Sequence, residues 1–308
     1  MSRATREAYG ETLVELVREG HDIMAVDADL AGSTKLADLQ KAFPKRFVDV
    51  GIAEQDMVGV AAGLSLTGRT VFTGSFAMFA TGRAYDQIRN TVCDSGLNVK
   101  ICPTHAGITV GEDGATHQSL EDIGMMRALP QMRVLVPADY WAAKAALRLA
   151  AEADGPFYVR MGRHKVPEIY DETFKGGVPY ATFLREGSDV TLVACGVEVA
   201  QSLAAADILI QEGISAEVID VFSVKPLDED AILASAAKTG RVVSVEEHNV
   251  ATGLGAAVAE LLAEKLPTPM RFAGMRTFGT SAPGDVLLSH FGLDGEGIAA
   301  RVREFVLA

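Results

Sequence analysis

The chain has 308 residues, of which 48% are hydrophobic and 22% charged, and its formal net charge is −13. This composition is typical of a globular protein with room for two domains of ordinary size. The acidic charge argues against nucleic acid or an anionic membrane as a partner, because both need a basic surface.

The cysteines and the apolar runs indicate the compartment. Cys93, Cys102 and Cys195 form no CxxC pair and leave one thiol over, which is typical of reduced cysteines. No apolar run is long enough to span a bilayer, and the N-terminal residues lack the apolar centre of a signal peptide. We therefore expect a cytoplasmic protein that does not enter a membrane.

Strand and helix patterns alternate through the first 165 residues. The apolar spacing around Leu13 predicts a first helix, and Ile23 to Val26 a buried strand. Ser33 is expected to cap the next helix, which Pro44 ends. Further strands are expected at 47–50, 70–73, 99–102, 133–136 and 156–161, and further helices from residue 54 and at 82–90, 120–129 and 141–153. This alternation predicts a parallel sheet covered by helices on both faces.

The pattern breaks between residues 166 and 187, where Pro167, Gly176-Gly177 and Pro179 interrupt it. We interpret this stretch as a linker between a first domain, residues 1–165, and a second, residues 188–308. In the second domain, strands are expected at 190–194, 216–221, 242–245 and 270–273, and helices at 197–212, 229–239, 254–265 and 298–306. The predicted fold class is α/β, with a mainly parallel sheet flanked by helices in each domain.

Glu54 opens a helix in which small and apolar residues occupy nearly every face. Such a helix is buried all round. A carboxylate in its first turn suits the positive end of the helix dipole. A buried carboxylate must also be paired or functional, because burial disfavours its charge. Both interpretations of Glu54 stand on this stretch alone.

The loop from Pro103 to Gln118 carries the strongest functional signal. His105, Asp113 and His117 lie in a loop at the carboxyl end of an expected parallel strand, where such folds bind ligands. Zinc is only weakly indicated, because the two histidines, twelve residues apart, lack further paired ligands. A histidine beside Asp113 favours proton transfer, since imidazole titrates near neutrality.

Several separated segments resemble transketolases. The run GEDGATHQ at 111–118, with His105 six residues before it, is similar to a loop of that family, and GIAE at 51–54 to the helix bearing its essential glutamate. Three more segments match in the same order, Ala4-Thr5-Arg6, Asp29–Ser33 and Gly155-Pro156 leading to Arg163. The resemblance covers essentially the whole chain, as the pyrimidine-binding domain (1–165) and the C-terminal domain (188–308) of that family.

One expected motif is missing. Transketolases bind the diphosphate of thiamine diphosphate, with its metal, through Gly-Asp-Gly followed by Asn, and no Gly-Asp-Gly tripeptide occurs in this sequence. The resemblance therefore implies the C-terminal subunit of a split transketolase with thiamine diphosphate as cofactor. Mg²⁺ or Ca²⁺ would be held by the partner chain, and no metal ligand is expected in this one. The implied assembly is a homodimer of heterodimers with an N-terminal subunit that carries the missing motif.

The resemblance also implies a role for each matching residue near the cofactor. Glu54 would share a proton with a nitrogen of the aminopyrimidine ring and so activate the cofactor. Phe76 and Phe79 would pack on that ring as apolar walls. Asp29 would lie near the positively charged thiazolium.

On the substrate side, His105 and His117 would bind sugar hydroxyls and transfer protons, so that the catalytic set is Glu54, His105 and His117. Asp113 would bind one sugar hydroxyl and select its configuration. Arginine suits phosphate because its planar fork binds two oxygens. The terminal phosphate would be held by Arg6, Ser33 and Arg163, with help from His105.

Two departures leave alternatives open. Gly82 stands where many transketolases have Tyr, and Arg83–Gln87 is similar to 1-deoxyxylulose 5-phosphate synthase and, less closely, to beta subunits of 2-oxo acid dehydrogenases. The expected reaction is transfer of a two-carbon ketol unit from a ketose phosphate to an aldose phosphate. The alternatives are those two enzymes and, from another class, a non-catalytic interaction protein. Arg163 and the 111–118 run favour transketolase, because the dehydrogenase has no sugar phosphate to bind.

The second domain is expected to serve assembly and to carry no catalytic residue. Its strands are apolar, and its sequence shows no polar cluster comparable to the 103–118 loop.

Overall fold

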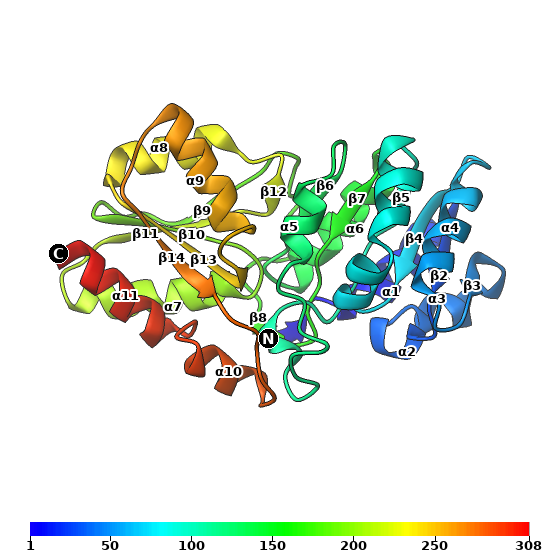
Figure 1. The fold of residues 1–308 in the computed structure, drawn as a ribbon, viewed down its shortest axis with the longest axis horizontal. Coiled ribbons are helices and arrows are strands. Elements are labelled where there is room, and N and C mark those ends of the chain that lie inside the picture. Colours follow the sequence, from blue (N-terminus) through cyan, green and yellow to red (C-terminus); the bar gives the residue numbers. More distant parts are fainter. Residues whose placement is uncertain (308) are drawn as a thin grey trace.

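The computed structural model describes residues 1–307 and consists of two α/β units side by side (Figure 1). The first unit is built on a seven-stranded sheet in the order β12-β6-β7-β5-β4-β2-β3, in which every neighbouring pair is parallel except β12 and β6. The strands are β2 (Ile23–Asp27), β3 (Phe47–Asp49), β4 (Thr70–Gly74), β5 (Val99–Ile101), β6 (Arg133–Leu135), β7 (Phe157–Val159) and β12 (Ser223–Lys225). The predicted parallel sheet is confirmed.

Helices cover both faces of this sheet. One face packs on α1 and α6, where Tyr9 and Leu13 meet Phe72 in one apolar cluster, and the other face packs on α4, α5 and two π-helical segments. Asp139 caps α6 by accepting a hydrogen bond from the backbone N–H of Ala142 (2.8 Å). The elements are α1 (Glu7–Arg18), α4 (Glu54–Ser65), α5 (Asp122–Arg127), α6 (Tyr140–Glu152) and the π-helical segments Phe79–Arg83 and Gln87–Asp94.

The single helix predicted between Ser33 and Pro44 is wrong. Two short helices, α2 (Ala31–Thr34) and α3 (Ala37–Ala42), stand there instead, separated by Lys35 at φ +76°. Ser33 lies inside α2 and caps no helix. The buried carboxylate of Asp27 organises this turn, because it accepts hydrogen bonds from the Leu30 N–H (2.6 Å) and the Thr34 hydroxyl (3.2 Å).

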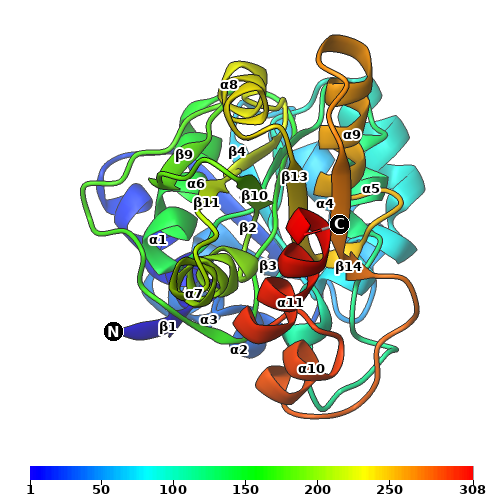
Figure 2. The same ribbon diagram turned by 90° about the vertical axis from the view of Figure 1, so that its left-hand side faces the viewer.

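The second unit has a five-stranded sheet in the order β14-β13-β10-β11-β9, parallel except at β9. Figure 2 shows α7 and α11 on one side of this sheet, and α8 and α9 pack on the other. The elements are β9 (Thr182–Arg185), β10 (Val190–Ala194), α7 (Glu198–Gln211), β11 (Ala216–Asp220), α8 (Glu229–Thr239), β13 (Val242–Asn249), α9 (Leu254–Lys265), β14 (Met270–Met275), α10 (Gly284–His290) and α11 (Gly295–Leu307).

The two units are joined by more than a connecting segment. β12 comes from the second half of the chain but pairs with β6 of the first sheet, and β9, inside the expected linker, forms an edge of the second sheet. β8 (Lys165–Pro167) pairs with β1 (Ser2–Ala4). One apolar cluster continues from the first unit into the second. The units therefore pack as one body.

Within residues 1–307, none of the helices combines the length and the apolar character that a membrane span requires.

Candidate active site

The candidate site lies at the carboxyl edge of the first sheet. A parallel bridge between Phe76 and Thr104 extends the pairing of β4 and β5 beyond their ends. This bridge brings Phe76 and His105 face to face, with ring centroids 3.8 Å apart and planes inclined by 25°. Backbone pairing between neighbouring strands therefore places these two predicted residues together.

Four of the predicted residues form one aromatic cluster. The ring centroids of Phe76 and Phe79 are 6.0 Å apart, and His117 packs edge-on against Phe79 at 5.1 Å. The His117 ring is anchored by a hydrogen bond of 2.9 Å between its Nδ1 and the hydroxyl of Thr116. The cluster brings residues from two loops, after β4 and after β5, onto one surface.

His105 is held as a neutral imidazole. It is buried, its Nδ1 lies 2.7 Å from the Thr104 hydroxyl, and its Nε2 lies 3.1 Å from Nη1 of Arg6. A guanidinium only donates, so Nε2 must accept and Nδ1 carries the proton. Burial, and then the charges of Arg6 and Arg163, lower the pKa of His105 to about 3. The expected histidine that titrates near neutrality beside Asp113 is therefore not His105, whose hydrogen-bond partners are Thr104 and Arg6.

Two guanidinium groups lie close to His105. Nη1 of Arg6 also donates to the backbone carbonyl of Ser33 (2.9 Å), so that Ser33 meets the site through its backbone. Burial and then the charge of Arg163 lower the pKa of Arg6. Arg163 is paired with Asp113 (3.2 Å) and Glu112 (3.2 Å). Arg6 thus contacts the histidine directly, whereas Arg163 acts on it through its charge and already has carboxylate partners.

Glu54 is the first residue of α4, and its side chain is only 4% exposed. It lies on a hollow of about 500 Å³ lined by residues 52–56 and Arg83. Its carboxylate accepts hydrogen bonds from Nη1 of Arg83 (3.1 and 3.2 Å) and a long one from the Ser75 hydroxyl (3.4 Å). The Arg83 guanidinium also lies over the ring of Phe79, 4.1 Å from its centroid, and links Glu54 to the aromatic cluster.

Arg83 is not among the residues that the sequence predicted for the site. The available signal was Glu54 itself, because a buried carboxylate needs a cationic or hydrogen-bonding partner. The π-helical segment Phe79–Arg83 carries both Phe79 and Arg83. Only this backbone geometry shows that Arg83, and not another arginine, is the cationic partner of Glu54.

Asp29 is the predicted residue that the structure leaves apart. Its backbone has φ +60°, its N–H donates to Asp49 (3.1 Å), and its exposed side chain makes no hydrogen bond or ion pair with other predicted site residues among residues 1–307. The neighbouring Asp27 is fully buried, and burial raises its pKa to about 7.

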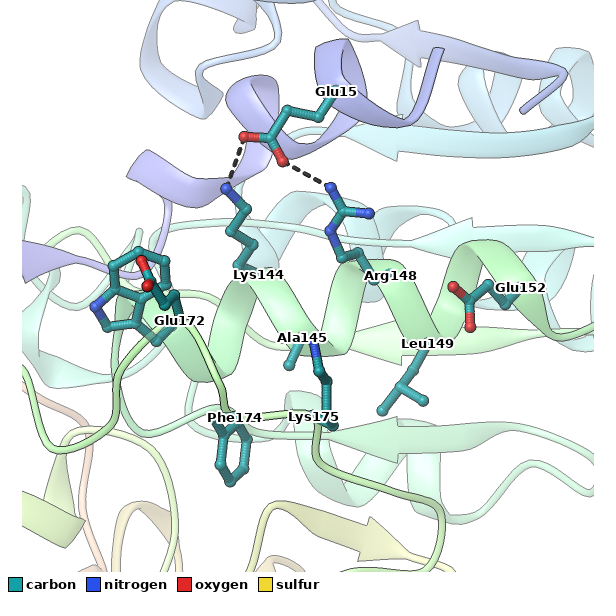
Figure 3. A pocket seen from close by; sticks show the side chains of 10 residues that line it. Glu15, Lys144, Ala145, Arg148, Leu149, Glu152, Glu172, Phe174 and Lys175 are labelled. Atoms are coloured by element: carbon teal, nitrogen blue, oxygen red, sulfur yellow. Dashed lines mark hydrogen bonds and ion pairs between the residues drawn. The ribbon is translucent and has the colours of Figure 1, made fainter. Parts of the chain in front are cut away.

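A separate hollow of about 510 Å³ lies between α1, α6 and residues 172–175 (Figure 3). Glu15 forms ion pairs there with Lys144 (2.7 Å) and Arg148 (2.7 Å), so the charged side chains that line the hollow largely neutralise one another. None of the predicted site residues lines it. The predicted site residues lie instead around Glu54 and His105.

No group of three or more His, Cys, Asp or Glu side chains within residues 1–307 is arranged to hold a metal ion. The oxygen and nitrogen donors of the candidate site are instead paired with arginines or hydroxyl groups.

Comparisons with known proteins match both units of the chain to one family. Residues 1–168 match the family model of the transketolase pyrimidine-binding domain, and residues 179–298 match that of the transketolase C-terminal domain. A protein of Methanocaldococcus jannaschii described as a transketolase C-terminal section is 48% identical over 308 residues, covering 98% of this chain and 96% of that protein. A 6-deoxy-6-sulfo-D-fructose transketolase subunit of a Clostridium species is 42% identical, covering 97% of this chain and 93% of its own length.

A solved structure described as a split gene transketolase, inactive beta4 tetramer, is 47% identical and superposes with a TM-score of 0.91. The match covers 99% of this chain and 98% of that one. Both the sequence and the fold of this chain are therefore similar to chains of the same extent.

Proposed function

This chain belongs to the transketolase family, and from that premise we propose that it is the C-terminal subunit of a split, thiamine diphosphate-dependent transketolase. Its partner would be an N-terminal subunit that supplies the Gly-Asp-Gly and Asn motif and the Mg²⁺ or Ca²⁺ site. The proposed reaction moves a two-carbon ketol unit from a ketose phosphate to an aldose phosphate. The proposed assembly is a homodimer of such heterodimers.

The observation that carries this proposal is the placement of Glu54. A carboxylate that is 4% exposed opens onto a hollow of about 500 Å³ and is connected through Arg83 to the aromatic cluster of Phe76, Phe79, His105 and His117. A planar heterocycle fits such a place, because it needs apolar faces and one polar contact at its edge. Thiamine diphosphate, when bound, supplies the nucleophilic carbon that accepts the ketol unit.

The residues of this chain would then divide the work. Glu54 would hold a proton at its carboxyl oxygen against the ring nitrogen, and Phe76 and Phe79 would keep water from the ring. Arg83 has to release part of its contact with Glu54 when the ring binds. Its side chain is 51% exposed and can swing into solvent, whereas Glu54 is 4% exposed. The buried Glu54 carboxyl would therefore be left neutral, with its proton shared with the ring nitrogen, and not as an unpaired charge. Asp29, at the carboxyl end of β2, would face the cationic part of the cofactor.

The substrate would bind between the two histidines and the two arginines. Neutral His105 presents the Nε2 lone pair that now contacts Arg6, and an incoming hydroxyl group could donate to it. His117 and Asp113 would bind further hydroxyl groups. Arg6, Arg163 and Ser33 would hold the terminal anion, for which Arg163 exchanges its contacts with Glu112 and Asp113.

The terminal anion is a matter for experiment, because a similar protein is described as acting on 6-deoxy-6-sulfo-D-fructose. A guanidinium fork binds phosphate and sulfonate oxygens by the same geometry. We propose a sugar phosphate as the natural donor, and the assay has to include a sulfonated ketose.

The test is reconstitution. This chain is co-purified with a candidate N-terminal subunit that carries Gly-Asp-Gly and Asn, loaded with thiamine diphosphate and Mg²⁺, and assayed with ketose and aldose phosphates. Ketol transfer by the pair and none by either chain alone is the expected result. Decarboxylation of a 2-oxo acid without ketol transfer would place the chain with the dehydrogenases or with 1-deoxyxylulose 5-phosphate synthase. Absence of every such reaction in a pair that holds the cofactor would favour the non-catalytic alternative.

A further inference from the structure

A buried carboxylate of the second unit is hydrogen-bonded to the loop of residues 103–118, which bears His105, Asp113 and His117. Glu247 lies near the carboxyl end of β13, is 3% exposed, and accepts hydrogen bonds from the backbone N–H (3.0 Å) and the hydroxyl (2.8 Å) of Thr109. Its carboxyl group also fills the space beside Gly107, so closely that a Cβ there would collide with it. Glu247 therefore contacts the loop two and four residues after His105.

Arg160 completes this contact from the first unit. Its guanidinium is buried between Glu247 (3.5 Å) and Asp122 (2.7 Å), and it also donates to the backbone carbonyl of Ser119 (3.3 Å) just after the loop. A buried charge has to be compensated from all sides. One ion network thus ties both ends of the loop to a strand of the second unit.

Three further contacts come from the segment that follows β14. The Gln118 side-chain amide donates to the carbonyl of Thr280 (2.9 Å), and the Ser281 hydroxyl donates to the carbonyl of Glu112 (2.6 Å). His164, next to Arg163, contacts Asp285 at 3.1 Å. The second unit therefore touches the chain beside His117, Asp113 and Arg163 as well as beside His105.

The loop needs such support because one of its non-glycine residues has a left-handed backbone. His105 has φ +60° although it has a side chain, whereas φ +80° at Gly107 is a conformation that glycine adopts readily. A residue in this region persists only where its surroundings fix it. His105 itself is fixed through Thr104, Arg6 and the Phe76 ring, whereas the backbone just after it is fixed by Glu247.

We propose that Glu247 is a positioning residue for the substrate site, through which the second unit sets the conformation of the loop that bears His105. This inference rests on the proposed function, because it assigns a role in ketol transfer to a loop contact. It revises the expectation that the second domain serves assembly alone. Because its carboxylate is engaged by Thr109 and Arg160, Glu247 would act through the loop and not as a catalytic residue.

The test uses two changes at the contact and one matched control. Glu247→Gln places an amide NH₂ where Thr109 or Arg160 already offers a donor, and Thr109→Val removes only the hydroxyl donor. The control is Glu246→Gln on the same strand. Glu246 is also fully buried, but it points to the opposite face and accepts hydrogen bonds from Leu254 (2.7 Å) and Gly255 (2.8 Å) at the start of α9.

Two readouts are compared between variants whose melting temperatures are lowered by the same amount. In the complex with the partner chain, Glu247→Gln is expected to lower kcat/KM at least tenfold, because a small displacement of a positioning group can reduce rates about a hundredfold. Glu246→Gln is expected to remain within about twofold of the wild type. In the isolated full chain, amide hydrogen exchange across residues 105–118 is expected to quicken in Glu247→Gln and Thr109→Val, and not in Glu246→Gln.

Equal kinetic losses in Glu247→Gln and Glu246→Gln would overturn the proposal, and so would unchanged exchange across residues 105–118. If the wild-type complex shows no ketol transfer, the proposed function fails by itself. The exchange experiment on the isolated chain then still decides whether Glu247 holds the loop.

Discussion

Glu54→Gln is the sharpest test of how this site works. Glutamine keeps the length of the side chain and one oxygen that can accept from Arg83, but it cannot share a carboxyl proton. The pair that it weakens joins a carboxyl that is 4% exposed to a guanidinium that is 51% exposed, and glutamine keeps one oxygen for Arg83, so we expect the free energy of unfolding to fall by about 1 kcal/mol. Positioned acid–base groups contribute about 10²–10⁴ in rate, and we expect a loss of at least that order.

The assay separates cofactor activation from substrate recognition. The complex with the partner chain is loaded with thiamine diphosphate, and hydrogen–deuterium exchange at the thiazolium carbon is followed alongside ketol transfer from several donors. In Glu54→Gln, exchange should slow and the rate of ketol transfer should fall by the same factor for every donor, because the proton on the ring is needed before any sugar binds. The melting temperature, measured in parallel, should change little.

Asp113→Ala is the matched control. Asp113 is 39% exposed, and its loss leaves Arg163 paired with Glu112, so the fold should tolerate the change. A lost hydrogen bond to a charged group is worth roughly 1.5–3 kcal/mol, which is about ten- to a hundredfold in the Michaelis constant. Exchange at the thiazolium carbon should be spared and the preference between sugar configurations narrowed. Equal loss of exchange in the two variants would refute this division of roles.

Three other outcomes are expected. Calorimetric titration of the isolated chain with thiamine diphosphate and Mg²⁺ should show no micromolar binding, and micromolar binding would contradict the split site. Burial holds the pKa of Asp220 at about 7, so the unfolded chain ionises first and the free energy of unfolding should fall as pH rises from about 4 to 7; Asp220→Asn, which still accepts from Tyr170, should flatten this slope in denaturant titrations, and an unchanged slope would exclude it as the source. The imidazole resonance of His105, assigned with His105→Gln, should stay constant between pH 5 and 8, and a midpoint near 6.5 would contradict its burial as a neutral ring.

Local sequence signals were sufficient for the fold class. Alternating strand and helix patterns predicted the parallel sheets, because burial on both faces leaves continuous apolar runs that end at turn residues. The failure at Ser33 has the opposite origin. A side chain suited to capping was present, but the turn is set by Asp27, seven residues before Thr34, whose burial depends on the packed sheet.

The predicted site residues were chosen by motif, and most of them meet in the structure. The stacking of Phe76 on His105 and the contact of Arg6 with His105 bring together residues 29 and 99 positions apart. The motifs in the sequence identified these residues as candidates. Their proximity comes from strand pairing at one sheet edge, since only the fold makes positions so far apart in the chain neighbours.

By itself, the sequence determined the alternation of elements, the candidate residues and the resemblance that connects them, because these are properties of order along the chain. The tertiary structure decided the protonation of His105, the pairing of Glu54 with Arg83 and the grip of Glu247 on Thr109. Each of these depends on burial and on the distance between side chains from separate elements. Those two quantities fix the strength of an electrostatic contact, and spacing along the chain does not contain them.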